Sequence, residues 1–305
     1  MSNSMQEKTI AIKIDVDTDR GTRIGVANLL KLFAELDIPA TFLFSLGPDN
    51  TGRAIKRIFR PGFLKKVSRS SIVSVYGVRT LLNGVLLPGP HIGKRNANIM
   101  HEAHLAGHEV GIHCYDHIRW QDGLAKMTQD EIHAELQKAR NEFQRIFKFS
   151  AKTAGAAGWQ ANALSLKAYD DAQLFYGSDI RGSYPFLPRV GDVVFKTLQV
   201  PTTLPTLDEL IGRPEYPLET LADFYLTQLV DNRANVFTTH AEIEGMTYLA
   251  WFKDFLQKAK AQGVRFVKVE DIAKQVLEQG EIPVCDMIQG TVDGRSGTMA
   301  VQGGV

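Results

Sequence analysis

Cysteine and long apolar runs are both scarce in this chain of 305 residues. Its only two cysteines, Cys114 and Cys285, exclude a disulfide framework, so we expect a reducing compartment. No uncharged apolar run approaches the ~18 residues that predict a membrane-spanning helix. The N-terminal sequence MSNSMQEKTIAIKIDVD does not have the pattern of a signal peptide. We therefore expect residues 1–7 to be a short N-terminal tail and the protein to be cytoplasmic.

An excess of charge of either sign is absent as well. The formal net charge is +1 and no nucleic-acid-binding motif occurs, so we expect no nucleic acid partner. Apolar residues make up 44% of the chain and charged residues 23%, which are the proportions of an ordinary globular protein. The length allows one large domain or two modest ones, and it leaves the oligomeric state open.

Acidic residues are missing from one long stretch, although the whole chain is nearly neutral. The stretch between Asp49 and Glu102 contains ten Lys and Arg residues and no Asp or Glu, and aliphatic residues are interleaved with the basic ones. We call residues 50–95 the basic insertion. Basic residues beside apolar ones are typical of segments that lie in an anionic membrane interface, where each contributes about 1 kcal/mol. The alternative is a long loop that packs on the fold with a solvated basic face.

The rest of the sequence alternates short β-branched segments with amphipathic ones. The predicted strands are residues 8–16, 40–46, 108–113, 150–156, 174–178, 193–200, 235–239 and 264–269. The predicted helices are residues 21–37, 96–106, 128–148, 161–171, 218–232, 247–262 and 269–279. This alternation predicts an α/β fold with a mostly parallel sheet, closed into a barrel or a distorted barrel. The barrel domain would span residues 8–279, and residues 280–305 would form a Gly-rich, flexible C-terminal tail.

Polar side chains lie at four of the predicted strand ends, where such barrels carry their chemistry. Asp15 and Asp17 would share one face, and their charges repel unless a cation or a proton lies between them. His113 and His117 are four residues apart, so on a helical turn both could bind one metal ion. Two histidines and one carboxylate leave positions open for water and substrate. His240 could protonate a leaving nitrogen, because histidine titrates near neutral pH.

Each of these patterns also has a structural explanation. Aspartates after a strand often cap the next helix, and a histidine pair in a turn is often only half-buried. His240 and Glu242 could likewise be satisfied or solvated polar residues. A further strand end carries Asp179 and Arg181, and this convergence favours a catalytic site over the structural explanations.

Five ordered motifs, IDVD, HCYDH, AAGWQ, SDIRG and FTTHAE, resemble those of the polysaccharide deacetylase (NodB homology) family. The resemblance covers residues 8–279 and implies a distorted seven-stranded (β/α) barrel of the NodB deacetylase type with one divalent metal ion. It implies Asp15 as catalytic base and His240 as general acid. It implies as metal ligands Asp17, His113 and His117. Such ligands accept zinc, cobalt, manganese or nickel.

The third motif departs from the family pattern. Many members carry an arginine just before the Gly-Trp pair to orient the base, whereas this chain has GAAGWQ. We expect Arg181, at the next strand end, to supply that positive charge near Asp15 and to act there with Asp179. The expected substrate-binding residues are Trp159, Gln160 and Glu242.

Longer runs, including IDVDTDRGTRIGV, FSLGPDN and VPTTLPTLDELIGR, are similar to one subgroup of the family. The subgroup removes the N-formyl group of 4-deoxy-4-formamido-L-arabinose linked to undecaprenyl phosphate. That implies aminoarabinose modification of lipid A, polymyxin resistance and a peripheral position on the cytoplasmic face of the anionic inner membrane. Side chains of the basic insertion would then meet the membrane and the lipid phosphate: Lys56, Arg57, Arg60, Lys65, Lys66 and Arg69.

Two other functions remain open. A peptidoglycan or chitin-type sugar N-deacetylase would use the same chemistry, but the missing secretion signal argues against it. A catalytically dead, membrane-attached carbohydrate-binding protein is the non-enzymatic alternative. The retained aspartates and histidines argue against it, because a binding protein needs no such set.

Overall fold

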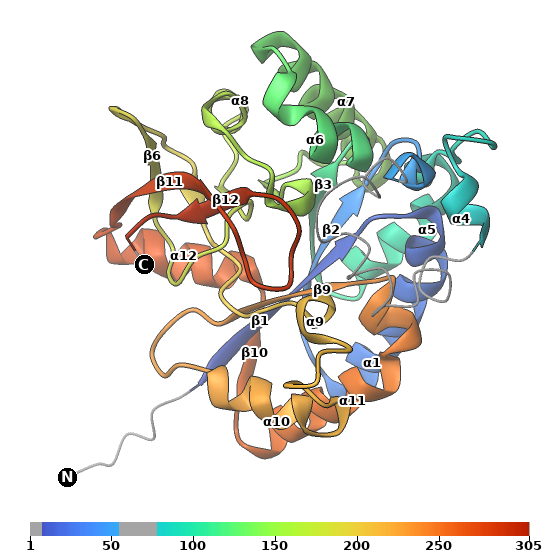
Figure 1. Ribbon diagram of the computed structural model, residues 1–305, viewed down its shortest axis with the longest axis vertical. Coiled ribbons are helices and arrows are strands. Elements are labelled where there is room, and N and C mark those ends of the chain that lie inside the picture. The colour runs from blue at the N-terminus through green and yellow to red at the C-terminus, as the bar shows by residue number, and fades with distance from the viewer. Residues whose placement is uncertain (1–7, 55–77, 305) are drawn as a thin grey trace.

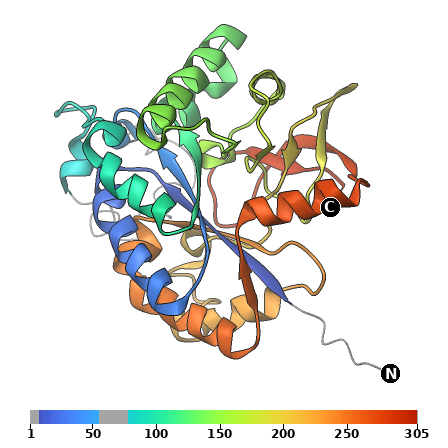
Figure 2. The same ribbon diagram turned by 180° about the vertical axis from the view of Figure 1, so that it is seen from behind.

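The centre of the molecule is a curled parallel sheet of eight strands, shown by a computed structural model that describes residues 8–54 and 78–304 (Figures 1 and 2). The strands are β1 (Thr9–Val16), β2 (Thr41–Ser45), β3 (Glu109–Cys114), β4 (Thr153–Ala154), β5 (Tyr176–Gly177), β8 (Leu198–Gln199), β9 (Val236–His240) and β10 (Arg265–Val267). β1 pairs with β9 along one edge and with β2 along the other, and β10 pairs with its start. From β2 the sheet continues through β3, β4 and β5 to β8. Beyond β8 the amides of Thr203 and Leu204 donate to the carbonyl of Val236, which brings the chain back to β9.

Helices cover the outer face of this sheet (Figures 1 and 2). The longer ones are α1 (Ala27–Leu36), α5 (Ile92–Leu105), α7 (Gln129–Phe147), α8 (Ala163–Asp171), α10 (Leu218–Gln228), α11 (Leu249–Ala261) and α12 (Val269–Gln279). The shorter ones are η1 (Gly21–Val26), α4 (Val78–Leu82), α6 (His117–Gly123), η3 (Leu124–Lys126), η4 (Ala157–Trp159), α9 (Leu207–Leu210) and η5 (Ile243–Thr247). α7 begins where the sequence predicts a helix, at a capping box of Thr128 and Glu131. The expected α/β fold is confirmed; the sheet has eight strands, whereas the family resemblance implied seven.

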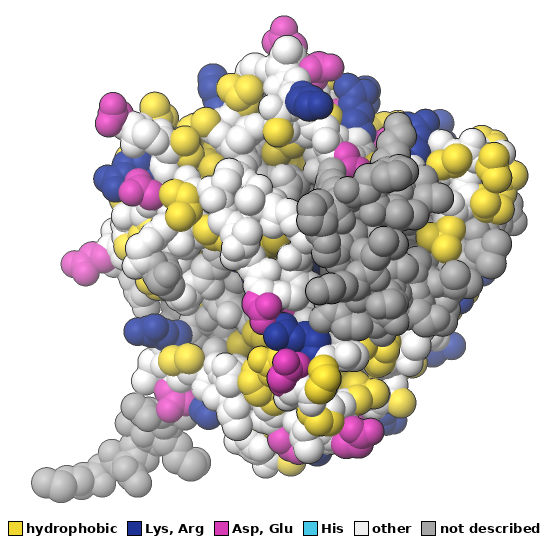
Figure 3. Space-filling model, in the orientation of Figure 1, with side chains coloured by type: hydrophobic (Ala, Val, Ile, Leu, Met, Phe, Trp, Pro, Cys, Tyr) yellow, Lys and Arg dark blue, Asp and Glu magenta, His cyan; other side chains and the backbone are white. Residues whose placement is uncertain are grey.

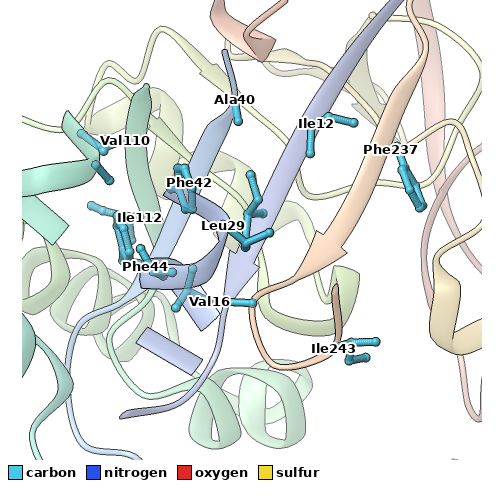
Figure 4. Packing of buried hydrophobic residues seen from close by; sticks show 14 of the residues in the cluster. Ile12, Val16, Leu29, Ala40, Phe42, Phe44, Val110, Ile112, Phe237 and Ile243 are labelled. Atoms are coloured by element: carbon cyan, nitrogen blue, oxygen red, sulfur yellow. The ribbon is translucent and has the colours of Figure 1, made fainter. Parts of the chain in front are cut away.

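The main core lies between the sheet and its helices. Along β1, alternate side chains such as Ile12 and Val16 point into this core, where they meet Phe42, Phe44 and Leu29 (Figure 4). These side chains are fully buried, and truncating a buried phenylalanine to alanine costs about 3–5 kcal/mol. The core therefore holds β1 firmly and presents its other face, which carries Lys13 and Asp15, to the inside of the curl.

The C-terminal segment is ordered, so the expected flexible tail over residues 280–305 is wrong. It forms β11 (Val284–Gly290) and β12 (Met299–Gln302), which join β6 (Leu187–Val190) and β7 (Val193–Val194) in a second sheet. Met299 and Ala300 are buried, and the backbone of Arg181 bonds to Ala300 and Gln302. Of the glycines that suggested mobility, Gly294, Gly297 and Gly304 lie at turns or bends with positive φ. The single strand expected over residues 193–200 is likewise divided between the two sheets.

Half of the basic insertion, residues 55–77, falls outside the described residues. The six basic residues expected at the membrane, Lys56, Arg57, Arg60, Lys65, Lys66 and Arg69, are all among residues 55–77, so their role stays a prediction. The N-terminal tail of residues 1–7 and residue 305 also lie outside. After α4 the described part of the insertion exposes three consecutive apolar residues, Val85–Leu87, and Figure 3 shows apolar side chains gathered near α4. Over residues 8–54 and 78–304, no helix has the length and apolarity to span a bilayer.

Candidate metal centre and active site

The carboxyl ends of β1, β3 and β9 bring the predicted metal and catalytic residues together. Asp15 lies in β1 and Asp17 directly follows it, while His240 is the last residue of β9 and the register partner of Asp15. His113 lies in β3, and His117 begins α6. The spacing predicted that the two histidines share a helical turn, and they do not. Instead the turn between β3 and α6 folds them side by side, with ring centroids 5.2 Å apart.

Asp17 and the two histidines form a compact group of possible metal ligands. Oδ1 of Asp17 lies 3.2 Å from Nε2 of His113 and 3.4 Å from Nε2 of His117. One ligand atom from each residue lies within 4.8 Å of the other two. Burial raises the pKa of Asp17, but the two histidines outweigh burial and hold that pKa well below its usual range. Two imidazoles and one carboxylate fit a divalent cation with open coordination positions.

Unsatisfied buried oxygens test whether a cation fits here. Asp15 is nearly inaccessible to solvent, yet its Oδ1 accepts no hydrogen bond, and neither does Oδ1 of Asp17. A buried carboxylate oxygen without a partner costs about 1–3 kcal/mol or more, so such atoms usually have a ligand that completes the site. Both unsatisfied atoms lie at the carboxyl end of β1, where the candidate metal ligands meet. The donor set and its unsatisfied oxygens therefore both fit a divalent cation.

Glu242, an expected substrate-binding residue, instead braces the loop that carries Asp17. Its Oε1 accepts hydrogen bonds from the amides of Asp17 (3.1 Å) and Thr18 (2.9 Å) and from the Thr18 hydroxyl (2.7 Å). Burial and the charge of Asp17 raise the pKa of Glu242 to about 8. The side chain is fully buried and has no surface to offer a substrate. A Cβ atom on Gly21 would lie 1.9 Å from this Oε1, which explains the glycine.

Two π-helices, η1 after β1 and η5 after β9, pack against each other beside the site. Single π turns are frequent at functional sites. Their contact needs glycine, because a Cβ atom on Gly25 would lie 2.0 Å from the carbonyl oxygen of Ala241, and one on Gly245 would lie 2.8 Å from that of Gly25. This contact fixes the strand ends that carry Asp17 and His240 relative to each other.

The positive charge beside Asp15 comes from Lys13 and not from Arg181. The guanidinium of Arg181 lies 2.6 Å from Oε1 of Glu209 and also donates to the carbonyl of Leu204. Lys13 Nζ lies 3.6 Å from Oδ2 of Asp15. The sequence reasoning missed this residue, although a signal existed. A lysine inside an otherwise apolar strand, two residues before Asp15, must share its face.

Three other predicted residues make hydrogen bonds inside the protein, in what we call the wall beside Asp15. Asp179 accepts hydrogen bonds from Tyr169 and Gln199, and burial raises its pKa to about 6. Trp159 is buried and donates to Thr202. The side-chain amide of Gln160 donates to the carbonyl of Thr298, 2.8 Å away. Direct contact of Trp159 or Gln160 with a substrate, and a catalytic role for Asp179, stay predictions.

The C-terminal segment completes this wall. The guanidinium of Arg295 lies 4.3 Å from the ring centroid of Trp159 and that of Arg181 lies 5.1 Å from it. Both arginines pair with Glu209, at 2.6 Å each, and Arg295 also pairs with Asp208. Arg295 was not among the predicted site residues, because the segment that carries it was expected to be a mobile tail.

The sequence comparisons that follow all point to one enzyme family. The family model described as polysaccharide deacetylase matches residues 2–176. A Shewanella sediminis protein named "Probable 4-deoxy-4-formamido-L-arabinose-phosphoundecaprenol deformylase ArnD" is 37% identical over 96% of this chain and 94% of its own length. A Wigglesworthia glossinidia brevipalpis protein with the same name is 35% identical over 92% of this chain and 98% of its own.

Solved structures agree on the fold. A structure named as a polysaccharide deacetylase from Mycobacterium smegmatis has a TM-score of 0.63 at 17% identity and covers 93% of this chain and 95% of its own. A family 4 acetyl xylan esterase from Clostridium thermocellum, solved with a cobalt ion, has a TM-score of 0.51 at 14% identity over 90% of this chain and 93% of its own. A CE4 family pseudoenzyme from Bacillus anthracis has a TM-score of 0.53 at 16% identity and covers 88% of this chain and 66% of its own.

The pseudoenzyme shows that this fold alone does not establish activity. The sequence matches extend over nearly the whole chain, and the side chains expected from the family's motifs converge at one end of the sheet. The chain belongs to the polysaccharide deacetylase family, and it is a carbohydrate amide hydrolase.

Proposed function

We propose that this protein hydrolyses the N-formyl amide of 4-deoxy-4-formamido-L-arabinose linked to undecaprenyl phosphate and releases formate. The observation that carries the proposal is the convergence at one site of an acid, a base and a ligand set: Asp15, Asp17, His113, His117 and His240. The names of the two ArnD relatives support the choice of substrate. The pathway served would be the aminoarabinose modification of lipid A, with resistance to polymyxin as its consequence.

The site residues divide the hydrolysis between them. When bound by Asp17, His113 and His117, a divalent cation supplies Lewis acidity that polarises the amide carbonyl and acidifies water. Oδ1 of Asp15 is buried and unsatisfied, and it is the atom that would take the proton of the attacking water. The water oxygen bonds to the formyl carbon and the carbonyl π bond opens; when that π bond re-forms, the C–N bond breaks. His240 donates a proton to the departing nitrogen, so the products are formate and the free amino sugar.

The same proposal places the protein on the cytoplasmic face of the inner membrane, where it would meet a lipid-linked substrate. The exposed side chains of Val85, Leu86 and Leu87 follow one another in the described part of the basic insertion. Arg53 donates to the carbonyl of Gly84 in the same turn, and Lys94 is exposed nearby in the sequence. An apolar tip next to basic side chains is suited to an anionic lipid interface.

A direct assay tests the proposed reaction. The purified protein is incubated with the lipid-linked N-formyl sugar and with its N-acetyl analogue, before and after metal removal by a chelator. We expect formate release that stops with the chelator and returns with zinc, cobalt, manganese or nickel. Acetate release at a higher kcat/KM than formate release would instead support the sugar N-deacetylase. Substrate binding without release of either acid, unaffected by the chelator, would support a carbohydrate-binding protein.

A further inference from the structure

Lys13 is the only buried lysine among the residues that the structure describes, and its side chain is 1% exposed. Moving a cation out of water costs several kcal/mol unless charges and hydrogen bonds offset the loss. Such a residue is costly at the centre of a strand whose inner face could have been apolar. Its partners therefore indicate what it does.

The ammonium group of Lys13 joins three elements of the site. Nζ donates to the carbonyl of Ser178, which follows β5, at 3.1 Å. It lies 3.6 Å from Oδ2 of Asp15 and 5.7 Å from the ring centroid of Trp159. Burial lowers the pKa of Lys13, and the charges of Asp15 and Asp179 oppose that change. Lys13 thus links the strand that carries Asp15 to the strand across the inside of the curl.

The two oxygens of Asp15 have different surroundings as a result. Oδ2 faces Lys13, whereas Oδ1 lies 3.8 Å from Nδ1 of His113 and accepts no hydrogen bond. A carboxylate can rotate about its bond to Cβ, and this torsion has a broad energy well. The contact with Lys13 distinguishes the two oxygens and leaves Oδ1 on the side of the metal ligands.

The third motif leaves room for this arrangement. A Cβ atom on Gly155 would lie 3.7 Å from Nζ of Lys13, 3.1 Å from the carbonyl oxygen of Ser178 and only 2.5 Å from Leu43. The residues that follow, Ala156 and Ala157, are small and uncharged. The motif therefore offers no cation of its own, and the one beside Asp15 is supplied by β1.

We propose that Lys13 is a positioning residue, whose ammonium group is anchored on the Ser178 carbonyl and holds Oδ2 of Asp15 so that Oδ1 faces the metal ligands. This inference rests on the proposed function. Its effect is on the orientation of the base, and metal binding should not depend on it.

The test compares Lys13→Met, which is similar in length and neutral, with Lys13→Arg, which keeps the charge. We expect Lys13→Met to lower kcat for formate release about 100-fold, while KM and metal content stay within about threefold of the unaltered protein. The kcat of Lys13→Arg should be at least about tenfold higher than that of Lys13→Met. Lys31→Met, a matched change of an exposed lysine in α1, should leave kcat unchanged.

A second set of measurements separates positioning from a structural role. In a double-mutant cycle, Lys13→Met combined with Asp15→Asn should lose no more activity than Asp15→Asn alone, because both act through one group. A crystal structure of metal-free Lys13→Met should show the Asp15 carboxylate turned away from the direction of Ser178. If Lys13→Met does not fold, Lys13→Gln can take its place, because its amide can still donate to Ser178.

The inference is rejected if the neutral variant keeps kcat within about threefold, if metal binding falls in parallel with kcat, or if the two substitutions act independently. An unaltered protein that releases no formate would reject the proposed function instead. The orientation of Asp15 in the variant crystal would still decide the role of Lys13.

Discussion

Asp15 and His240 are register partners on the adjacent parallel strands β1 and β9. The amide of Ala241, the next residue, donates to the carbonyl of Asp15 at 3.1 Å. Neighbouring strands lie about 4.8 Å apart, so the backbone ladder itself sets the spacing of the proposed base and the proposed acid. Neither residue can shift relative to the other without breaking the sheet.

Asp15→Asn and Asp17→Asn should differ in a way that separates base from ligand. Asp15→Asn removes the proton acceptor, so kcat/KM should fall by at least about 100-fold while bound metal stays near one equivalent. Asp17→Asn removes a ligand, so bound metal should be lost together with activity. Metal analysis of the purified variants, together with formate release, makes the comparison. Equal metal loss in both would mean that Asp15 is itself a ligand.

Gly21→Ala should weaken the site from a distance. The new Cβ atom would lie 1.9 Å from Oε1 of Glu242, so the brace on Asp17 and Thr18 must move. We expect a loss of about 1–3 kcal/mol in the free energy of unfolding and about a 10- to 100-fold weaker metal affinity. Urea unfolding and metal titration measure the two effects. Gly123→Ala is the control, because its Cβ atom would meet only the flexible end of Met127, at 3.2 Å.

Glu109 should make the stability of the protein depend on pH. Burial raises its pKa to about 7, against an ordinary value of 4.5, so between these values the folded state binds more protons than the unfolded state. This contribution is fully present below about pH 4.5 and is lost as the pH rises through 7. Glu109→Gln should therefore gain stability relative to the unaltered protein between pH 5 and 8. Urea unfolding across that range measures the difference in the free energy of unfolding between the two proteins. A difference that does not change with pH would contradict the prediction.

Arg295→Ala should destabilise the wall beside Trp159. It removes one of the two guanidinium groups paired with the buried carboxylate of Glu209, and we expect a loss of about 3 kcal/mol. The control is Arg189→Ala, whose ion pair with Asp286 is largely exposed, and it should cost less than about 1 kcal/mol. Chemical denaturation of both variants gives the comparison. Similar small losses would show that the C-terminal segment contributes little to the wall.

Leu86→Asp should weaken binding to anionic membranes. Leu86 is 75% exposed at the apolar tip, and a charge there opposes insertion between lipids. Sedimentation with phosphatidylglycerol vesicles should show at least about a fivefold loss of bound protein. Leu105→Asp changes a comparably exposed leucine at the end of α5 and should bind as the unaltered protein does. Unchanged binding by both variants would remove the tip from the proposed membrane surface.

The sequence predicted the alternating strands and helices well, because apolar periodicity reflects burial against a core. The ends of β1, β3 and β9 were correct to within about two residues, which was enough to bring the candidate ligands together. The turn between His113 and His117 was wrong, because a spacing of four residues fits either one helix or a strand followed by a helix.

Contacts between distant segments were harder to predict. Nothing local in the sequence shows that Arg181 turns to Glu209 or that residues 284–302 build a sheet beside Trp159. Lys13 could have been found, because the alternation of β1 already places it on the face of Asp15. The prediction placed the positive charge on Arg181, because the family's arginine lies outside the strand that carries the base.

The position of β1 at the centre of the sheet has a consequence during synthesis. The strand is translated before its partner β9, which follows more than 200 residues later, as the sequence separation of 225 between Asp17 and its brace Glu242 illustrates. At ordinary translation rates this leaves one edge of β1 unpaired for roughly ten seconds or more. An apolar strand with an open edge readily pairs with other chains. The nascent protein should therefore depend on chaperones until β9 emerges.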